Sequence, residues 1–189
     1  MSDHHNEPFW RKYIFSVDHK IIGIQYGITS LLFLLFGFIL MLVMRWNIAN
    51  PGQAVPFIGG LLSEEGMLTP DKYNSFGAMH GTIMVFLGVV PLAVGAFGNY
   101  VVPIQVGAPD MAFPKLNMAS YWVYFVGGVI MLSSFFMPSG TASSGWTMYA
   151  PLASIANTGE TIWLISMLFL ITSSSVSYTH LTLPTNREV

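Results

Sequence analysis

The chain has 189 residues, of which 53% are hydrophobic and only 8% are charged. Because ordinary soluble domains carry about a quarter charged residues, a water-soluble globule of this composition would lack polar surface, and we expect an integral membrane protein. The net charge of −2, without a basic cluster, excludes nucleic acid as a partner, and the absence of cysteine excludes disulfides and thiolate metal sites.

Four apolar segments follow one another along the chain. Residues 21–44 carry no charge and are long enough, at about 1.5 Å per residue, to cross a hydrocarbon core of about 30 Å. A second uncharged run covers residues 75–102 and contains Pro91, which a membrane helix tolerates by a kink whose freed carbonyl finds another partner. The third span covers residues 116–137. The fourth begins at Thr161, and its apolar run of about a dozen residues is too short to cross a bilayer comfortably.

These segments predict an all-α, polytopic transmembrane helix bundle with three full spans and a truncated fourth. Basic residues are more frequent on the N-terminal side of the expected membrane than on the opposite side, which places the N-terminus in the cytoplasm. The residues counted are Arg11, Lys12, Lys20 and Lys115 on the first side, and Arg45 and Lys72 on the second. We expect a cytoplasmic segment over residues 1–20, a transmembrane domain over residues 21–176, and a non-native tail over residues 177–189.

One histidine, His80, lies within the second span. An ionisable group inside a membrane span is costly, usually faces the bundle interior and often marks a site or a pathway. The alternative is a histidine that only hydrogen-bonds a neighbouring helix. Gly77 and Gly81 flank His80, and with Gly88 and Gly95 they clear one helix face, which admits either another helix or a flat cofactor. Together they fit a haem wall in which the imidazole supplies one axial ligand to the iron.

Polar residues near the ends of the spans are further candidates. Arg45 ends the first span on the same side as His80, where its guanidinium either hydrogen-bonds a polar haem substituent or anchors the span by snorkelling. At the other side, Asn99 and Asn117 bracket Asp110. Such a group either holds water at the mouth of a proton route or forms a capped interfacial turn.

Several segments, in their order and spacing, resemble subunit I of the haem–copper terminal oxidases, and look like the cytochrome c oxidase branch. The resemblance covers about residues 10–172, and its longest motif is too long for chance similarity. The matching segments are FSVDHKIIGIQY, AMHGTIMVF, PLAVGAFGNYVVPIQVGAPDMAFPKLNMASYW and SGWTMYAPL.

The resemblance implies the catalytic subunit of a respiratory enzyme that reduces O₂ to water with electrons from cytochrome c and pumps protons. It places His80 at the position of an axial ligand to the iron of a low-spin haem, with haem a expected and with Gly77 and Gly81 beside the ring. Arg45 falls at the position that contacts a substituent of this haem.

The resemblance further implies a proton pathway. Asp110 matches the acid at the cytoplasmic entrance of the family's proton channel, and Asn99 and Asn117 match the asparagines that hold water beyond it. The bacterial inner (plasma) membrane is the expected location. The expected partners are the lipid bilayer, oxidase subunits II and III, cytochrome c, and the rest of subunit I.

By analogy with the family, whose subunit I has about twelve helices, the chain is an N-terminal fragment that we expect to be inactive alone. The ligands of the high-spin haem and of copper would lie beyond it. Two alternatives remain open. One is subunit I of a quinol oxidase in the same superfamily, and the other is a haem-free transport or channel protein in which Asp110, Asn99 and Asn117 line a conducting path.

Overall fold

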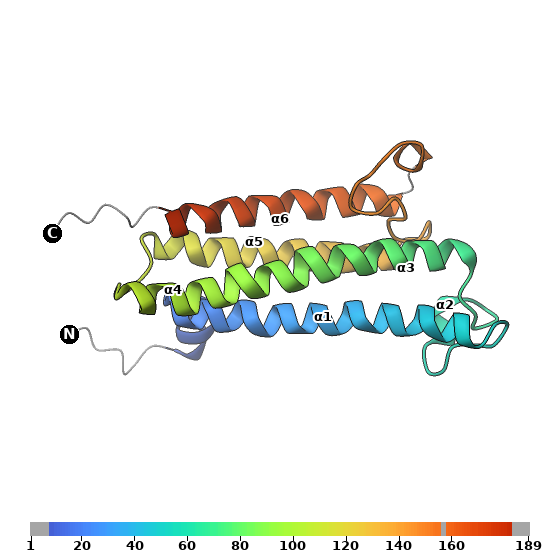
Figure 1. Ribbon diagram of the computed structural model, residues 1–189, viewed down its shortest axis with the longest axis horizontal. Helices are drawn as coiled ribbons and strands as arrows, with labels where there is room; N and C mark the ends of the chain where they lie inside the picture. Colours follow the sequence, from blue (N-terminus) through green and yellow to red (C-terminus); the bar gives the residue numbers. More distant parts are fainter. Residues whose placement is uncertain (1–7, 156–157, 183–189) are drawn as a thin grey trace.

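The computed structural model describes residues 8–155 and 158–182, with side chains described as far as residue 177. The long helical rods lie side by side and alternate in direction along the chain, so the first and last described residues lie at the same end of the bundle (Figure 1). The described residues contain helices and no strand, which confirms the all-α class. Among the described residues, four helices are long and apolar enough to cross a membrane.

The first span is α1, His19–Ala49, preceded by a single π-helical turn, η2, Trp10–Ile14. Asp18 caps α1, because its carboxylate accepts a hydrogen bond from the backbone N–H of Lys20 at 2.7 Å. Such a cap satisfies one of the N–H groups that lack a partner inside the first turn. The helix ends at Ala49, just before Pro51, and is longer at both ends than the uncharged run.

The second span is one continuous rod, Pro70–Val106, of 37 residues. It consists of α3, Pro70–Thr82, two π-helical stretches, η3, Ile83–Val89, and η4, Pro91–Gly98, and a final α4, Asn99–Val106. The hydrogen-bonding pattern changes on both sides of Pro91, since proline has no N–H to donate to the preceding turn. Gly107 ends the rod with a φ of +73°, a left-handed conformation that glycine adopts without strain.

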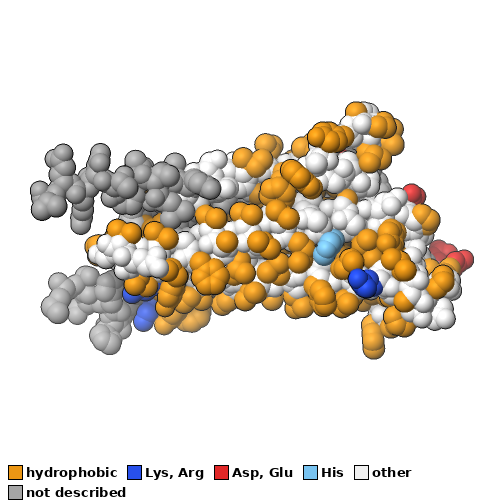
Figure 2. All heavy atoms as spheres, viewed as in Figure 1, with side chains coloured by type: hydrophobic (Ala, Val, Ile, Leu, Met, Phe, Trp, Pro, Cys, Tyr) orange, Lys and Arg blue, Asp and Glu red, His pale blue; other side chains and the backbone are white. Residues whose placement is uncertain are grey.

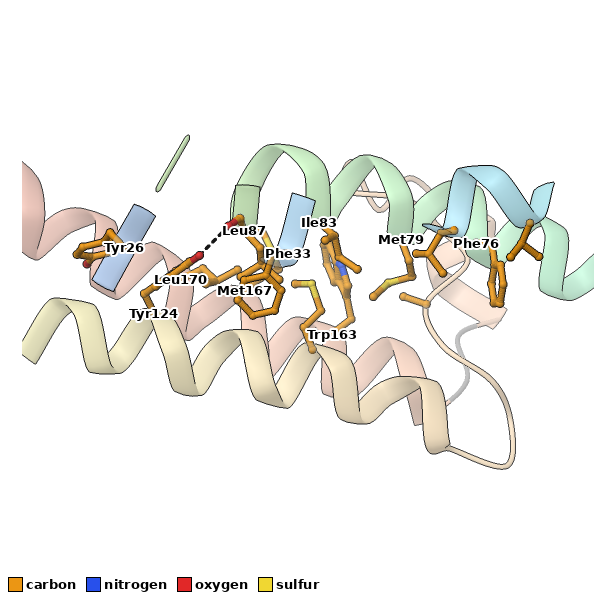
Figure 3. Close-up of a cluster of buried hydrophobic side chains, with 14 of the residues drawn as sticks. Tyr26, Phe33, Phe76, Met79, Ile83, Leu87, Tyr124, Trp163, Met167 and Leu170 are labelled. Atoms are coloured by element: carbon orange, nitrogen blue, oxygen red, sulfur yellow. Dashed lines mark hydrogen bonds between the residues drawn. The ribbon is translucent and has the colours of Figure 1, made fainter. Parts of the chain in front are cut away.

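A backbone carbonyl one turn before Pro91 has a hydrogen-bond partner on another helix. Leu87 lies four residues before Pro91, so its carbonyl is the one that an N–H at position 91 would satisfy in an α-helix. The hydroxyl of Tyr124, from the third span, donates to this oxygen at 2.7 Å (Figure 3). In the π-helical stretches here the bonds run five residues back, as from the N–H of Val90 to the oxygen of Val85, so that Tyr124 satisfies a carbonyl one turn before Pro91. That this carbonyl is the one freed by the proline stays a prediction.

The third span consists of α5, Pro114–Ser133, and a short 3-10 turn, η5, Ser134–Phe136. The fourth is α6, Thr158–Thr182, and it is longer than the sequence predicted. Its residues up to Ser177 are long and apolar enough to span a membrane. The polar residues after Thr172 do not end the helix, because Ser173 and Ser177 point inward and hydrogen-bond Ser120 of α5. A hydropathy average registers these serines as polar, but it does not register the hydrogen bonds that they make to the neighbouring helix.

Long connections lie at the end of the bundle opposite the chain ends, and a short one lies at the same end (Figure 1). Residues 50–69 link the first two spans and contain α2, Gly59–Leu62, and the α5–α6 connection contains η6, Leu152–Ile155. The buried carboxylate of Glu160, at the start of α6, accepts from the backbone N–H of Ser143 at 3.2 Å and from the hydroxyl of Ser144. This contact ties the connection to the helix.

The buried core lies between the rods. Phe76, Met79, Ile83 and Leu87 form a row along the second span, facing side chains of the other spans such as Trp163 (Figure 3). The outer faces are also apolar: hydrophobic side chains cover the length of the molecule in Figure 2, and acidic side chains gather at the end that carries the long connections. An apolar outer surface of this size is what a lipid-facing bundle requires.

Candidate functional site

His80 lies near the end of α3, ten residues or about 15 Å along the helix from Pro70. Its side chain is half-buried, and its Nδ1 lies 2.8 Å from the backbone oxygen of Gly37 in α1. A carbonyl oxygen can only accept a hydrogen bond, so Nδ1 carries the proton and donates it. In the neutral imidazole, the lone pair then belongs to Nε2.

This geometry is typical of a metal-binding histidine, whose second ring nitrogen donates to a carbonyl, a carboxylate or water and thereby fixes the ring. No described residue hydrogen-bonds Nε2 of His80, and Nε2 is not among the enclosed polar atoms that lack a partner. Nε2 is therefore accessible at the open side of the half-buried ring. The residues present fit an iron ligand at this position.

Gly37 is the contact that the sequence did not reveal. A side-chain carbon at Gly37 would lie 2.8 Å from the sulfur of Met84, one turn beyond His80, so the missing side chain lets the two spans approach closely. The signal in the sequence was a single glycine in the middle of an apolar helix, and nothing there linked it to position 80. The backbone approach at Gly37 is what places its carbonyl within reach of the imidazole.

The glycines of the second span serve different purposes. A carbon added at Gly77 would meet the end of Met44 at 3.3 Å, and one added at Gly95 would lie 2.6 Å from the ring of Tyr26. A carbon at Gly88 would overlap Leu34. These three glycines pack the second span against α1. Gly81 differs, because an added carbon meets nothing within 4 Å, so the helix surface directly beside His80 is open.

Arg45 lies in the last two turns of α1, and its side chain is exposed. It follows Gly37 by eight residues, which corresponds to about 12 Å along the helix axis. Arg45 is therefore at the same end of the bundle as His80, but on an adjacent face of α1. The structure brings the two residues to the same region without a contact between them.

The described residues contain no group of three or more metal-ligating side chains. The other described histidine whose side chain is placed, His19, belongs to the opposite end of the bundle. It is 3% exposed, and its Nδ1 lies 2.9 Å from the backbone oxygen of Asn99. No other histidine whose side chain is described lies near His80.

The predicted proton-pathway residues lie at the end that carries the chain termini. Asn117 is 1% exposed, and neither its amide nitrogen nor its amide oxygen has a hydrogen-bond partner among the described residues. Asn99 is also buried; its amide nitrogen donates to the backbone oxygen of Gly95 at 2.6 Å, and its amide oxygen has no described partner. Buried amides of this kind usually bind ordered water.

Asp110 lies in the α4–α5 connection and is half-exposed. Its carboxylate accepts from the backbone N–H of Met111 at 2.7 Å, and no ion pair joins it to Lys115 in the described part of the chain. This bond fixes one carboxylate oxygen of Asp110. The half-exposed carboxylate remains accessible at the end of the bundle where Asn99 and Asn117 also lie.

A row of hydroxyl groups continues inward from Asn117, and the sequence analysis missed it. Ser120 donates to the backbone oxygen of Asn117 at 2.9 Å, and its hydroxyl oxygen lies 3.0 Å from the hydroxyl of Tyr26 and 3.2 Å from that of Ser177. The hydroxyl of Ser173 donates to the backbone oxygen of Ser120 at 2.7 Å. The spacing of three between Asn117 and Ser120 was the available signal, since it places both on one face of α5.

In the described part of the chain, these features define a polytopic helical membrane protein with a half-buried histidine whose Nε2 has no described partner, and with buried, unpartnered amide atoms at the opposite end. The chain belongs to the family described as cytochrome c and quinol oxidase polypeptide I, which matches residues 21–186. The family is one of haem–copper oxidases, so haem and copper are expected in it.

Among its relatives, the chain is 42% identical over 167 residues to cytochrome c oxidase subunit 1 of Thermostichus vulcanus, covering 87% of this chain and 28% of that protein. It is 40% identical over 176 residues to cytochrome c oxidase subunit 1 of Synechocystis sp., covering 92% and 29%. It is 37% identical over 165 residues to the alternative cytochrome c oxidase subunit 1 of Bradyrhizobium diazoefficiens, covering 87% and 26%. The chain therefore spans less than a third of the length of these relatives.

Proposed function

We propose that this chain forms part of the catalytic subunit of a respiratory terminal oxidase, which reduces O₂ to water with electrons from cytochrome c and moves protons across the membrane. The observation that carries this proposal is His80, whose Nδ1 donates to Gly37 while Nε2 has no described partner. The relatives named cytochrome c oxidase subunit 1 support the electron donor.

In this proposal, Nε2 of His80 is an axial ligand to the iron of a low-spin haem, with haem a as the expected type. A haem bound there would supply reversible one-electron transfer. The hydrogen bond to Gly37 fixes the plane of the imidazole and raises its basicity as a ligand. The open surface at Gly81 leaves room beside the ligand, and the exposed guanidinium of Arg45 is free to contact a polar substituent of the ring.

The same proposal assigns proton uptake to the opposite end of the bundle. Asp110 would receive protons at the surface, and water held by Asn99 and Asn117 would conduct them inward. Support comes from the unpartnered amide atoms of these buried asparagines and from the hydroxyl row that begins at Ser120. The N-terminal end would face the cytoplasm, since basic residues are more frequent there.

Several parts of such an enzyme would come from outside this chain. We propose that the second axial ligand, the high-spin haem, copper and their ligands belong to the remainder of subunit I, and that subunits II and III complete the assembly. The isolated chain would then not reduce O₂. It would retain only the haem ligand and the entrance of the proton pathway.

Haem titration of the full 189-residue chain in detergent tests the central assignment. Binding to the parent chain should shift the Soret band of the added haem, and His80→Ala should lose this shift. His19→Ala is the matched control, because it removes an imidazole at the other end and should leave the shift unchanged. An identical spectrum for the parent and His80→Ala would refute the assignment.

A quinol oxidase is the second candidate, because the family description covers both kinds of enzyme. The two kinds of enzyme differ in the electron donor. Purification of the intact subunit with its partners, followed by a comparison of cytochrome c and quinol as donors, would distinguish them. A colourless intact product would instead favour a haem-free transport protein.

A further inference from the structure

The segment before α1, which we call the N-terminal hook and define as residues 8–17, turns back along the bundle. The side-chain amide of Gln25 donates to the backbone oxygens of Tyr13 at 2.6 Å and Ile14 at 2.9 Å. Gln25 lies six residues after His19, or about 9 Å into α1. The hook therefore lies beside the first turns of α1 rather than extending away from them.

A second contact fixes the hook at the same depth. The ring of Phe15 stacks on Trp122 of α5 with centroids 5.1 Å apart and an interplanar angle of 25°. Trp122 lies eight residues after Pro114, or about 12 Å into α5. Since α1 has 31 residues and is about 46 Å long, it exceeds a hydrocarbon core of about 30 Å by roughly 8 Å at each end. Gln25, about 9 Å into α1, therefore lies close to the boundary between the lipid headgroups and the hydrocarbon core, and so does the part of the hook that it binds.

The hook presents aromatic and basic side chains together on its outer side. Phe9 is 64% exposed and Trp10 is 67% exposed, although both are large apolar residues. Arg11 and Lys12 are exposed between them and Tyr13, and the Lys12 ammonium lies 5.4 Å from the centre of the Tyr13 ring. This composition is typical of segments that lie in the membrane interface, where aromatic rings reach the acyl boundary and cations contact headgroups.

Charge at this end of the bundle decides which headgroups fit. Among the described residues, four cations face two carboxylates here: Arg11, Lys12, Lys20 and Lys115 against Asp18 and Asp110. Both carboxylates already accept backbone N–H groups, Asp18 from Lys20 and Asp110 from Met111. The excess of cations is complementary to a negatively charged lipid surface.

We propose that the N-terminal hook is a binding surface for anionic phospholipid headgroups, with Arg11 and Lys12 contacting phosphate and Trp10 reaching the acyl boundary. The proposed contacts are independent of the haem and proton-pathway proposals, because Trp10, Arg11 and Lys12 belong to neither. Each cation near an anionic membrane surface should enrich the acidic lipid locally by about fivefold at low ionic strength.

The full chain, reconstituted into phosphatidylcholine vesicles, tests this surface by quenching of Trp10. The vesicles contain the same minor fraction of a brominated lipid, either phosphatidylglycerol or phosphatidylcholine. Because the chain has five tryptophans, the signal of Trp10 is the difference between the parent and Trp10→Phe. At about 10 mM salt, brominated phosphatidylglycerol should quench this difference signal several times more effectively than brominated phosphatidylcholine.

The double variant Arg11→Gln, Lys12→Gln should reduce the ratio of the two quenching constants to about one, as should about 1 M salt, where the Debye length falls to about 3 Å. Lys115→Gln is the matched control: it removes a cation at the same end but outside the hook, and should leave the ratio high. Circular dichroism verifies that the variants keep their helix content. Equal quenching by both lipids in the parent at low salt, or quenching by neither because protein covers Trp10, would overturn the proposal.

Discussion

The hydroxyl of Tyr124 offers a direct test of how this bundle tolerates a proline in a membrane span. It donates to the carbonyl of Leu87 at 2.7 Å, its oxygen lies 3.3 Å from the hydroxyl of Ser30, and Tyr124 is 2% exposed. Tyr124→Phe removes the donor without changing the shape of the ring. A buried carbonyl that loses its partner costs about 1–3 kcal/mol, and hydrogen bonds between membrane helices average about 0.6 kcal/mol with a maximum near 1.7. We therefore expect the variant to lose about 1–2 kcal/mol of unfolding free energy.

The reasoning makes a sharper prediction for the pair. Pro91→Ala supplies an N–H that can donate to Leu87 itself, so Tyr124→Phe should cost less in that background, with a coupling energy of about 0.5–1 kcal/mol. The assay is reversible denaturant unfolding of the full chain in mixed micelles, followed by tryptophan fluorescence. Tyr121→Phe is the control, because its hydroxyl lies 3.0 Å from that of Thr29 and does not depend on Pro91.

Two results would refute this account. One is an equal cost of Tyr124→Phe with proline and with alanine at position 91. The other is a Tyr121→Phe cost that changes as much between the two backgrounds as that of Tyr124→Phe. Either would mean that the hydroxyl stabilises the bundle by general packing and not by satisfying the carbonyl that proline frees.

Three further predictions follow from the packing and the buried polar groups. Gly95→Ala should lower the free energy of unfolding by about 1–3 kcal/mol in the same assay, because the added carbon would lie 2.6 Å from the buried ring of Tyr26. Gly81→Ala is the control, since its added carbon meets open space and should leave the free energy of unfolding unchanged. Equal losses for the two variants would contradict this prediction. Asn117→Leu should leave stability unchanged or raise it by up to about 2 kcal/mol, because neither amide atom has a described protein partner; a loss above about 2 kcal/mol would show that its hydration is structural. Sequencing of the coding DNA beyond codon 172 should reveal further histidine-bearing spans in frame; a genuine stop directly after Val189 would contradict the expected non-native tail.

Much of the fold could be predicted from hydropathy alone. Uncharged runs of sufficient length located the first three spans to within a few residues, since lipid requires a continuous apolar helix whatever packs against it. The length of the fourth span could not be predicted in this way. Its inward serines hydrogen-bond the backbone and side chain of Ser120, and a composition window cannot distinguish a serine that faces lipid from one that faces a partner helix.

The candidate site also has features that the sequence predicts and features that only the tertiary structure shows. The sequence by itself determined that one imidazole lies within an apolar span and that two asparagines flank an acid at the other end, because the cost of polar groups in lipid makes such residues conspicuous. Only the tertiary structure decided which ring nitrogen of His80 remains for a ligand and which glycines serve helix packing. The first depends on the approach of Gly37, 43 positions away, and the second on the side chains of α1 that face the glycines, Leu34, Met44 and Tyr26. These contacts are set by how the rods pack and leave no periodic signal in either segment.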